Sequence, residues 1–398
     1  MSRLRIVTSS IVLGALLSYA LPSEAIPVFA RKYGYNCTMC HSAFPRLNDY
    51  GLRYRQNGYQ LPGRENEDIN VLQAQAPFAG RTSVGYNYDR IRNVPGETSV
   101  NQFQANGLDI LSGGLFRRNV GYFMIYTPEI RGSRGIVPQD GNLEMANVVF
   151  SNLRSTWLNI RVGQFEPEYL PISAKRSLTY SPYEIYAFAF PSGLPLSDTQ
   201  SGLELYGYGP GGFKYAAGWV NGSNSNRSDD SPADFYLRGV KIFGQGEGQT
   251  VGQRLGVLGY FGRARPDPTF PVTTRQSFNR IGLDASLNYR QLNLSLVWMK
   301  GTDDAALWNA ASDVDFTGGF AELIYQPAFD LVMFTRWDAV NPDNASGIDD
   351  IKRWTLGGRY YLYENISLHM EYSYAKQRNP AGPDETEKFF TTRIDFAF

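Results

Sequence analysis

The chain has 398 residues, 38 of them basic and 38 acidic, so its formal net charge at neutral pH is zero. This balance argues against a nucleic-acid partner, because a surface that binds nucleic acid carries a clustered excess of lysine and arginine. Aromatic residues make up 14% of the chain and hydrophobic residues 42%, and there are 40 glycines. These proportions are unusual for a soluble core of this size and favour a closed sheet with an apolar outer face and a hydrated interior.

Residues 1–25 have the pattern of a secretory signal peptide. Arg3 and Arg5 precede a mostly apolar run, and the small residues Ser23 and Ala25 follow it at the spacing of a cleavage site. A membrane anchor is the alternative, but hydroxyl residues interrupt the run and it is shorter than the roughly 20 apolar residues of a spanning helix. We therefore expect export, with the mature chain beginning at about residue 26.

Both cysteines and one of the two histidines lie in a single hexapeptide, NCTMCH. Cys37, Cys40 and His41 fit the pattern C-x-x-C-H, which attaches c-type haem through two thioether bonds and places the histidine beneath the iron. A redox-active cysteine pair would need a βαβ context, and a zinc site would need further Cys or His ligands nearby. We therefore predict one covalently bound haem c.

Residues 26–78 are predicted to form a small helical plug around this motif. Pro45 opens a segment in which Leu47 and Tyr54 share a helical face, and Gly58 lies where a C-terminal cap is expected. Gly51, inside this segment, either lets the backbone approach the porphyrin or simply weakens the helix. A unit of this length has only marginal stability on its own, and we therefore expect the haem to supply much of its apolar interior.

From residue 79 onward the chain has the pattern of successive β-strands. In the segment 281–289, apolar side chains alternate with polar ones at a period of two residues. The same alternation recurs in 158–162, 292–298, 353–362 and 366–372. A one-sided soluble sheet would alternate in the same way, but it would need a second apolar layer, and the chain has no amphipathic helices to supply one.

The connections between these strands favour a membrane barrel over a β-sandwich. About sixteen strands fit between residues 81 and 398, an even number in the range of bacterial outer-membrane barrels. Long polar connections are predicted at 127–141, 164–200, 221–234, 263–275, 300–313, 341–350 and 377–388. Short ones alternate with them at 152–155, 209–212, 290–291, 326–329 and 363–365. We therefore predict an all-β, antiparallel transmembrane barrel over residues 79–398, surrounded by outer-membrane lipid.

The end of the chain adds an independent signal. Phe390, Ile394, Phe396 and Phe398 share one face of the last predicted strand, while polar side chains share the other. A terminal aromatic residue at an outward position resembles the last strand of bacterial outer-membrane proteins. This pattern supports the outer-membrane prediction.

The run Ile26–Leu61 resembles the amino-terminal signature of the fused outer-membrane monohaem cytochrome c–porins, the family that includes bacterial iron oxidases. Around the haem motif the matching positions are Pro27, Phe29, Ala30, Arg31, Pro45, Leu47, Asn48, Gly51, Gly58 and Tyr59. The resemblance implies a haem plug inside or against a sixteen-stranded pore, with electrons passing from an extracellular donor to periplasmic carriers. It does not specify the donor.

The thickness of the membrane favours a haem inside the barrel. The hydrocarbon layer is roughly 25–30 Å thick, too far for one haem at the periplasmic surface to exchange electrons efficiently with a donor outside. A sixteen-stranded barrel leaves a lumen wide enough for a small domain. We therefore expect the plug in the lumen, with the N-terminus entering from the periplasmic side.

His369 and Met299 are the candidates for the second axial ligand of the iron. The alternation of their strands points both side chains toward the lumen. For each, the alternative is an inward-facing residue with no special role, because a polar side chain in a wet lumen needs none. A five-coordinate iron or a ligand from the plug itself stays open.

Two further features bear on the donor. The connection 164–200 is the longest and carries several aromatic residues, so it is expected either to fold inward as a constriction or to cover the outer side of the haem. Acidic pairs at 229–230, 303–304 and 349–350 fall on predicted outer loops and could attract Fe(II), although aspartate is common in solvated loops.

Three functions fit these features. The first is an electron conduit that oxidises an extracellular donor, with Fe(II) as the leading candidate, and passes electrons through one haem to a periplasmic cytochrome or similar carrier. The second is an outward conduit to extracellular acceptors, built from the same parts. The third is a solute-selective porin with a structural haem. Basic and acidic residues share the predicted inner face, so no ion selectivity is indicated.

Overall fold

The computed structural model describes residues 28–65, 67, 78–92, 96–128, 141–188, 196–222, 234–244, 252–264, 276–308, 310–343, 350–378 and 383–398. The predicted signal peptide and the acidic residues at 229–230 and 349 lie outside these ranges. Among the described residues, no helix has the length and apolar character needed to cross a membrane.

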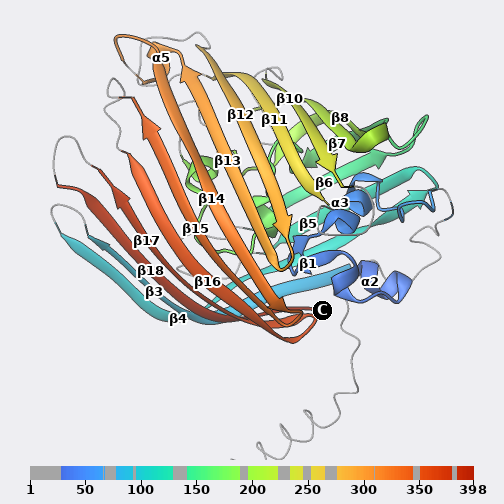
Figure 1. The fold of residues 1–398 in the computed structure, drawn as a ribbon, viewed down its shortest axis with the longest axis horizontal. Helices are drawn as coiled ribbons and strands as arrows, with labels where there is room; N and C mark the ends of the chain where they lie inside the picture. Colours follow the sequence, from blue (N-terminus) through green and yellow to red (C-terminus); the bar gives the residue numbers. More distant parts are fainter. Residues whose placement is uncertain are drawn as a thin grey trace, which may run out of the picture.

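Sixteen strands, β3 to β18, close into one antiparallel barrel, as the sequence predicts (Figure 1). Each strand pairs with its neighbours in the chain, and β18 closes the barrel by pairing with β3. The strands are β3 (Phe78–Arg92), β4 (Glu97–Arg117), β5 (Val120–Thr127), β6 (Asn142–Phe150), β7 (Asn159–Phe165), β8 (Gln200–Gly209), β9 (Phe213–Val220), β10 (Asp234–Phe243), β11 (Gln253–Ala264), β12 (Gln276–Tyr289), β13 (Leu292–Asp303), β14 (Val314–Ala328), β15 (Leu331–Pro342), β16 (Ile351–Tyr363), β17 (Ile366–Gln377) and β18 (Glu385–Ala397).

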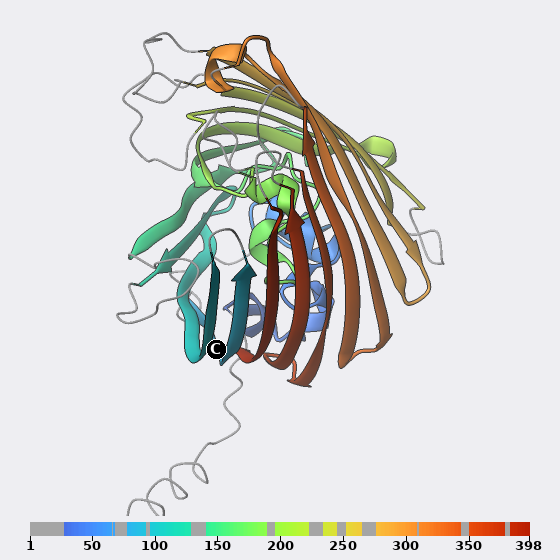
Figure 2. The same ribbon diagram turned by 90° about the vertical axis from the view of Figure 1, so that its left-hand side faces the viewer.

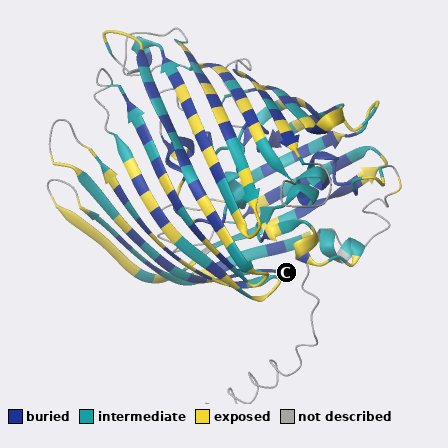
Figure 3. Cartoon of the chain, viewed as in Figure 1, coloured by how far each residue is buried: buried dark blue, intermediate teal, exposed yellow. Residues whose placement is uncertain are grey.

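The two faces of the barrel wall have the predicted opposite characters. Outward positions such as Leu283 and Trp298 are exposed, whereas inward positions of the same strands, such as Asp284 and Ser295, are buried. Figure 3 shows this alternation of exposed and buried residues along the strands. Arg336 and Asp338, both inward on β15, are fully buried and form an ion pair of 2.6 Å. An apolar outside and a polar, ion-paired inside are what a barrel in a lipid bilayer requires.

The two ends of the barrel differ in their connections. At one end, which we call the short-turn end, the connections include 118–119, 290–291, 329–330 and 364–365. The opposite, long-loop end carries the described parts of the connection between β7 and β8 and of that between β13 and β14, which contains helix α5 (Ala305–Trp308). β18 begins at Glu385, earlier than predicted, because its first polar residues still pair with β17 beyond the apolar belt. The chain ends at the short-turn end, where Phe398 and Gly80 exchange backbone hydrogen bonds of 2.7 and 2.8 Å.

A plug of short elements precedes the barrel in the chain. It consists of helix α2 (Val28–Tyr33), a 3-10 turn η1 (Cys37–Met39), a small sheet of β1 (His41–Ala43) and β2 (Arg46–Leu47), and helix α3 (Asp49–Gln56). Contrary to the prediction, Pro45 does not open α3. The helix begins at Asp49 because the Asn48 side chain caps it, accepting the Gly51 N–H at 2.9 Å. Gly58 has the positive φ of 65° expected just past a helix end.

The plug lies inside the barrel toward its short-turn end. Its residues contact inward side chains on opposite walls: Tyr59 stacks on Phe123 of β5 at 5.5 Å, and Arg46 forms an ion pair of 2.8 Å with Glu322 of β14. Figure 2 shows the plug, in blue, surrounded by strands. It also bonds to the short turns, where Gln60 donates to the Ser151 hydroxyl at 2.7 Å.

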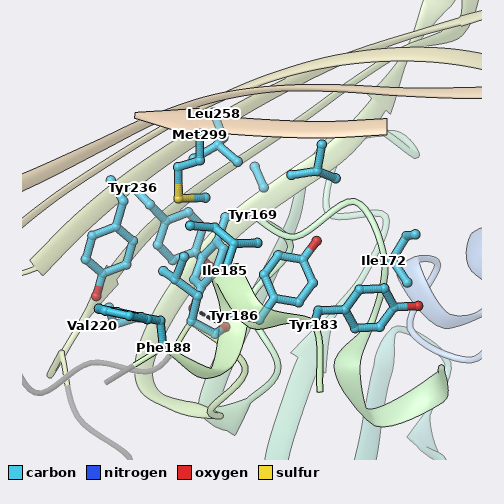
Figure 4. Close-up of a cluster of buried hydrophobic side chains, with 14 of the residues drawn as sticks. Tyr169, Ile172, Tyr183, Ile185, Tyr186, Phe188, Val220, Tyr236, Leu258 and Met299 are labelled. Atoms are coloured by element: carbon cyan, nitrogen blue, oxygen red, sulfur yellow. Dashed lines mark hydrogen bonds between the residues drawn. The ribbon is translucent and has the colours of Figure 1, made fainter. Parts of the chain in front are cut away.

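The connection between β7 and β8 also folds into the lumen, which is one of the two predicted options. We call its described residues, 166–188 and 196–199, the inward loop; it includes η3 (Ala174–Arg176) and helix α4 (Glu184–Ala187). Tyr183 and Tyr186 of this loop belong to a buried cluster that also contains Met299, Leu258 and Tyr236 of the wall (Figure 4). The inward loop thus builds an apolar core with the wall inside the barrel.

Candidate functional site

A cavity separates the plug from the barrel wall and the inward loop. Its empty space is about 1160 Å³, a figure that includes the open solvent at its mouth. Cys37, Cys40 and His41 all border it. The rest of its lining is mainly aromatic and aliphatic, with Phe29, Tyr33, Tyr35, Phe44, Leu47, Tyr54, Tyr59, Leu61, Leu111 and Phe123.

The η1 turn presents both cysteines to this cavity. The Cys40 N–H donates to the Cys37 carbonyl at 3.1 Å, which closes the turn, and the Cys37 N–H donates to Glu364 on a short turn of the barrel at 2.8 Å. Both thiols are free. Burial, with a further contribution from the Glu364 carboxylate, raises the pKa of Cys37 to about 12, and burial also raises the pKa of Cys40. At neutral pH the pair is therefore protonated, a state in which cysteines oxidise slowly.

The His41 ring is oriented by one hydrogen bond. Its Nδ1 lies 3.1 Å from the Pro45 carbonyl oxygen. A carbonyl only accepts, so Nδ1 carries the proton, and the lone pair of the neutral ring is on Nε2. Burial lowers the pKa of His41 to about 4, so the ring is neutral at physiological pH. These are the conditions for an imidazole that ligates a metal through Nε2.

The cap of helix α3, Asn48, and Gly51 in its first turn both contact the motif turn. The Asn48 N–H donates to the Cys40 carbonyl at 2.9 Å, and the Asn48 side-chain amide donates to the Met39 carbonyl at 3.0 Å. A Cβ on Gly51 would collide with that same Cys40 carbonyl and with Leu47. Gly51 borders the cavity as well, but its lack of a side chain is required by contact with the motif backbone.

Neither predicted second ligand reaches this cavity. Both side chains face inward, as the alternation predicts, and both are fully buried. His369 Nε2 lies 3.2 Å from Glu371, and the His369 ring meets the Tyr180 ring edge-on at 4.9 Å between centroids. Met299 packs in the aromatic cluster of the inward loop (Figure 4). Among the described lining residues, His41 is the sole histidine and none is a methionine.

The one predicted acidic pair that the structure describes is not a free cluster of carboxylates. Asp303, at the end of β13, is buried and forms an ion pair of 2.5 Å with Arg280. Asp304 bonds to the first turn of α5, where it accepts the Ala306 N–H at 3.0 Å. Both carboxylates therefore have structural partners.

A second, polar cavity adjoins the first on the side of the long loops. It has about 1300 Å³ of empty space, open solvent at its mouth included, and shares Phe44, Pro45 and Arg81 with the first cavity. From there it extends between the inward loop and the wall to Thr127, at the long-loop end of β5. The sequence did not predict this cavity. The alternation along the strands shows which side chains face the lumen, but it does not show which part of the lumen the inward loop fills.

Comparison with known proteins gives the fold. No family model matches the chain, and no curated protein matches it. Among solved structures, an anion-selective porin from Comamonas acidovorans aligns with a TM-score of 0.57 and 12% identity over 81% of this chain and 99% of its own. The outer-membrane channel DcaP of Acinetobacter baumannii gives 0.58 and 12% over 81% and 96%, and Salmonella typhi OmpF gives 0.56 and 12% over 81% and 97%. The barrel has the outer-membrane porin fold.

Proposed function

We propose that this protein is an electron conduit of the bacterial outer membrane. It would hold one haem c in the apolar cavity beside Cys37, Cys40 and His41, which we call the haem cavity. The haem would oxidise an extracellular donor, with Fe(II) as the leading candidate, and pass the electron to a periplasmic cytochrome or similar carrier. The observation that carries the proposal is the convergence of Cys37, Cys40 and His41 on one apolar cavity inside a membrane-type barrel. The resemblance to the cytochrome c–porin signature supports the same function.

The cavity residues fit the group that the motif implies. Cys37 and Cys40 would attach the haem, and Nε2 of His41 would ligate its iron, because Nδ1 is held by Pro45. When bound, the haem supplies reversible one-electron transfer. The aromatic lining, which comes from the plug and from Phe123 of β5, would limit the access of bulk water to the haem. Fewer water molecules then reorient when the charge of the haem changes.

The position of the motif suggests which end faces which compartment. Short turns face the periplasm in barrels of this kind, so we place the short-turn end there and the apolar outer face in the membrane lipid. Thr38 and Met39, between the two cysteines, are exposed at this end. A periplasmic carrier could therefore approach the cofactor edge closely, and the N-terminus would enter from the periplasmic side.

The polar cavity offers a route for the donor from the other side. It leads from the long-loop end to the wall of the haem cavity and is bordered by Asp109, Glu144 and Asp395. Each carboxylate forms an ion pair: Asp109 with Arg81 at 2.5 Å, Glu144 with Lys175 at 3.0 Å, and Asp395 with Arg359 at 2.7 Å. A small hydrated ion would thus meet a polar, nearly neutral passage.

The test is to express the full chain with a c-type haem maturation system and to purify it in detergent. We expect one covalently attached haem by mass spectrometry and reduction of its Soret and α bands when Fe(II) is added. Replacing both Cys37 and Cys40 by alanine should abolish covalent attachment. A wild-type protein without covalent haem, or with a haem that Fe(II) leaves oxidised, would overturn the proposal.

A solute channel is the second candidate, and the fold likeness favours it. The neighbours in the comparison include a porin described as anion-selective and an outer-membrane channel, and the polar cavity shows that the lumen is not completely filled. Against it, the plug and the inward loop occupy the part of the lumen that a solute would cross. Under this function the haem would be structural and the conductance of the purified protein substantial.

A further inference from the structure

The charged side chains that border the haem cavity are all of one sign. Arg55 comes from helix α3, Arg81 from β3 and Arg176 from the η3 turn of the inward loop. Among the described lining residues there is no aspartate, glutamate or lysine. Guanidinium groups beside an apolar cavity lose hydration, so they are stable there only when anions face them.

Arg81 forms an ion pair with a carboxylate that neither Arg55 nor Arg176 binds, whereas Arg55 and Arg176 bind the same carboxylate. Arg81 forms an ion pair of 2.5 Å with Asp109. Arg55 and Arg176 both bind Glu166, through the same carboxylate oxygen, at 3.4 and 2.5 Å. These two guanidinium groups, one from the plug and one from the inward loop, therefore meet at one carboxylate on the edge of the cavity.

The ion-pair network around them carries more cations than carboxylates. Glu168 lies within ion-pair distance of Arg55 and also of Arg161 and Lys214, and Arg161 pairs in turn with Glu204. Among the residues that the structure describes, these pairs and the Glu166 pairs comprise four cations (Arg55, Arg161, Arg176 and Lys214) and three carboxylates (Glu166, Glu168 and Glu204). Burial and repulsion from Arg55 lower the pKa of Arg176, which is the effect of a buried cation without a full counter-charge.

We propose that Arg55 and Arg176 form a binding subsite for the carboxylates of the cofactor, the propionate groups of a tetrapyrrole. A guanidinium binds a carboxylate through two parallel N–H donors, which makes arginine the suitable cation for this role. The proposal rests on the proposed function, because it requires the haem to be bound. It extends that function by giving the cofactor an orientation, with its acidic edge toward the inward loop and away from the solvent-exposed Thr38 and Met39.

The subsite would also couple the inward loop to the plug. Arg55 belongs to the plug and Arg176 to the loop, so carboxylates bound between them join the two segments. Without the cofactor, the direct ion-pair link between these two arginines runs through the single carboxylate of Glu166.

The test uses the haem-loaded full chain with Arg176→Gln, Arg176→Lys and, as the control, Lys175→Gln. Lys175 is the neighbouring residue on η3, but it pairs with Glu144 and borders the polar cavity, not the haem cavity. Two readouts are measured on each variant: the haem midpoint potential by spectroelectrochemistry and the propionate bending bands by resonance Raman spectroscopy.

We expect Arg176→Gln to lower the midpoint potential and to shift the propionate bands. Ferric haem has one more positive charge than ferrous haem, so removal of a cation from the propionates favours the ferric state. Arg176→Lys should restore part of both changes, because lysine keeps the charge but not the paired donors. Lys175→Gln should match the wild type in both readouts.

The outcomes separate this proposal from the proposed function. If the wild type carries no covalent haem, both are overturned. If the haem is attached but the Arg176→Gln bands and potential equal those of Lys175→Gln, the subsite is overturned and the proposed function is untouched. If Arg176→Gln cannot be recovered folded, Arg176→Lys decides: a partial shift in both readouts supports the subsite, and wild-type values overturn it.

Discussion

Gly51 is a single residue on which the geometry of the candidate site depends. Its missing side chain leaves room for the Cys40 carbonyl against helix α3. In Gly51→Val the new side chain would push the motif turn away from the helix, and such overpacking costs about 1–3 kcal/mol. We expect a several-fold lower haem-to-protein ratio, measured from the Soret absorbance.

The control for this substitution is Gly96→Ala. A Cβ at Gly96 has no atom within 4 Å, so its haem content should equal that of the wild type. Equal haem content in Gly51→Val and Gly96→Ala would show that the close contact between the motif and α3 is not needed.

The proposed axial ligation of a haem iron also depends on single residues. His41 borders the cavity, whereas His369 is bound to Glu371 and Met299 is packed in the aromatic cluster. We expect His41→Ala to change the Soret and α bands strongly. His369→Gln and Met299→Leu should leave both bands at their wild-type wavelengths, even though they disturb buried contacts. A shifted spectrum in His369→Gln would mean that this side chain reaches the iron.

At the scale of elements, the inward loop lies between the cavity beside the two cysteines, which Arg176 borders, and the long-loop end of the barrel. Glu371 on β17 anchors it by accepting the backbone N–H groups of Tyr180 and Ser181, at 2.8 and 2.7 Å, and the Ser181 hydroxyl at 2.5 Å. Without this carboxylate, buried N–H groups would lack an acceptor, at a cost of about 1–3 kcal/mol each. We therefore expect Glu371→Ala to release the loop locally and to make it susceptible to protease in detergent.

The matched control is Glu97→Ala on β4. Glu97 forms an ion pair of 2.6 Å with Arg90, but both side chains are more than 40% exposed. Exposed pairs of this kind contribute about 0–1 kcal/mol, so the protease sensitivity of the loop should not change. Equal cleavage of the loop in both variants would contradict its anchoring by Glu371.

At the scale of the whole molecule, the barrel is wide enough to enclose a second structure. Its wall supplies buried charges, and the plug and inward loop neutralise many of them, as Arg46 does for Glu322 and Glu184 does for Arg353. The lumen is consequently occupied by protein across much of its section, which is unlike the open channel of a sixteen-stranded porin.

This filling predicts a low ionic conductance. In a planar bilayer, the intact protein should conduct far less than an open porin of equal strand number, and Glu371→Ala should raise the conductance by freeing the inward loop. A wild-type conductance equal to that of an open porin would favour the solute channel over the electron conduit.

The sequence by itself determined the barrel, its strand faces and the position of the C-x-x-C-H motif. Each of these depends on local information: a period of two residues along a strand, or the spacing of residues within a hexapeptide. The alternation predicted correctly that His369 and Met299 face the lumen. It could not predict that neither side chain lies near the cysteines. Alternation shows that a side chain points into the lumen, but it does not show where the side chain lies along the barrel axis or around the barrel.

Only the tertiary structure decided which residues surround the cavity. The contact of Cys37 with Glu364 joins positions 327 residues apart, and Arg176 reaches the cavity because its loop turns into the lumen instead of outward. Both arrangements follow from barrel closure and from the ion pairs between loop and wall. These interactions act between distant segments, so no local pattern in the chain records them.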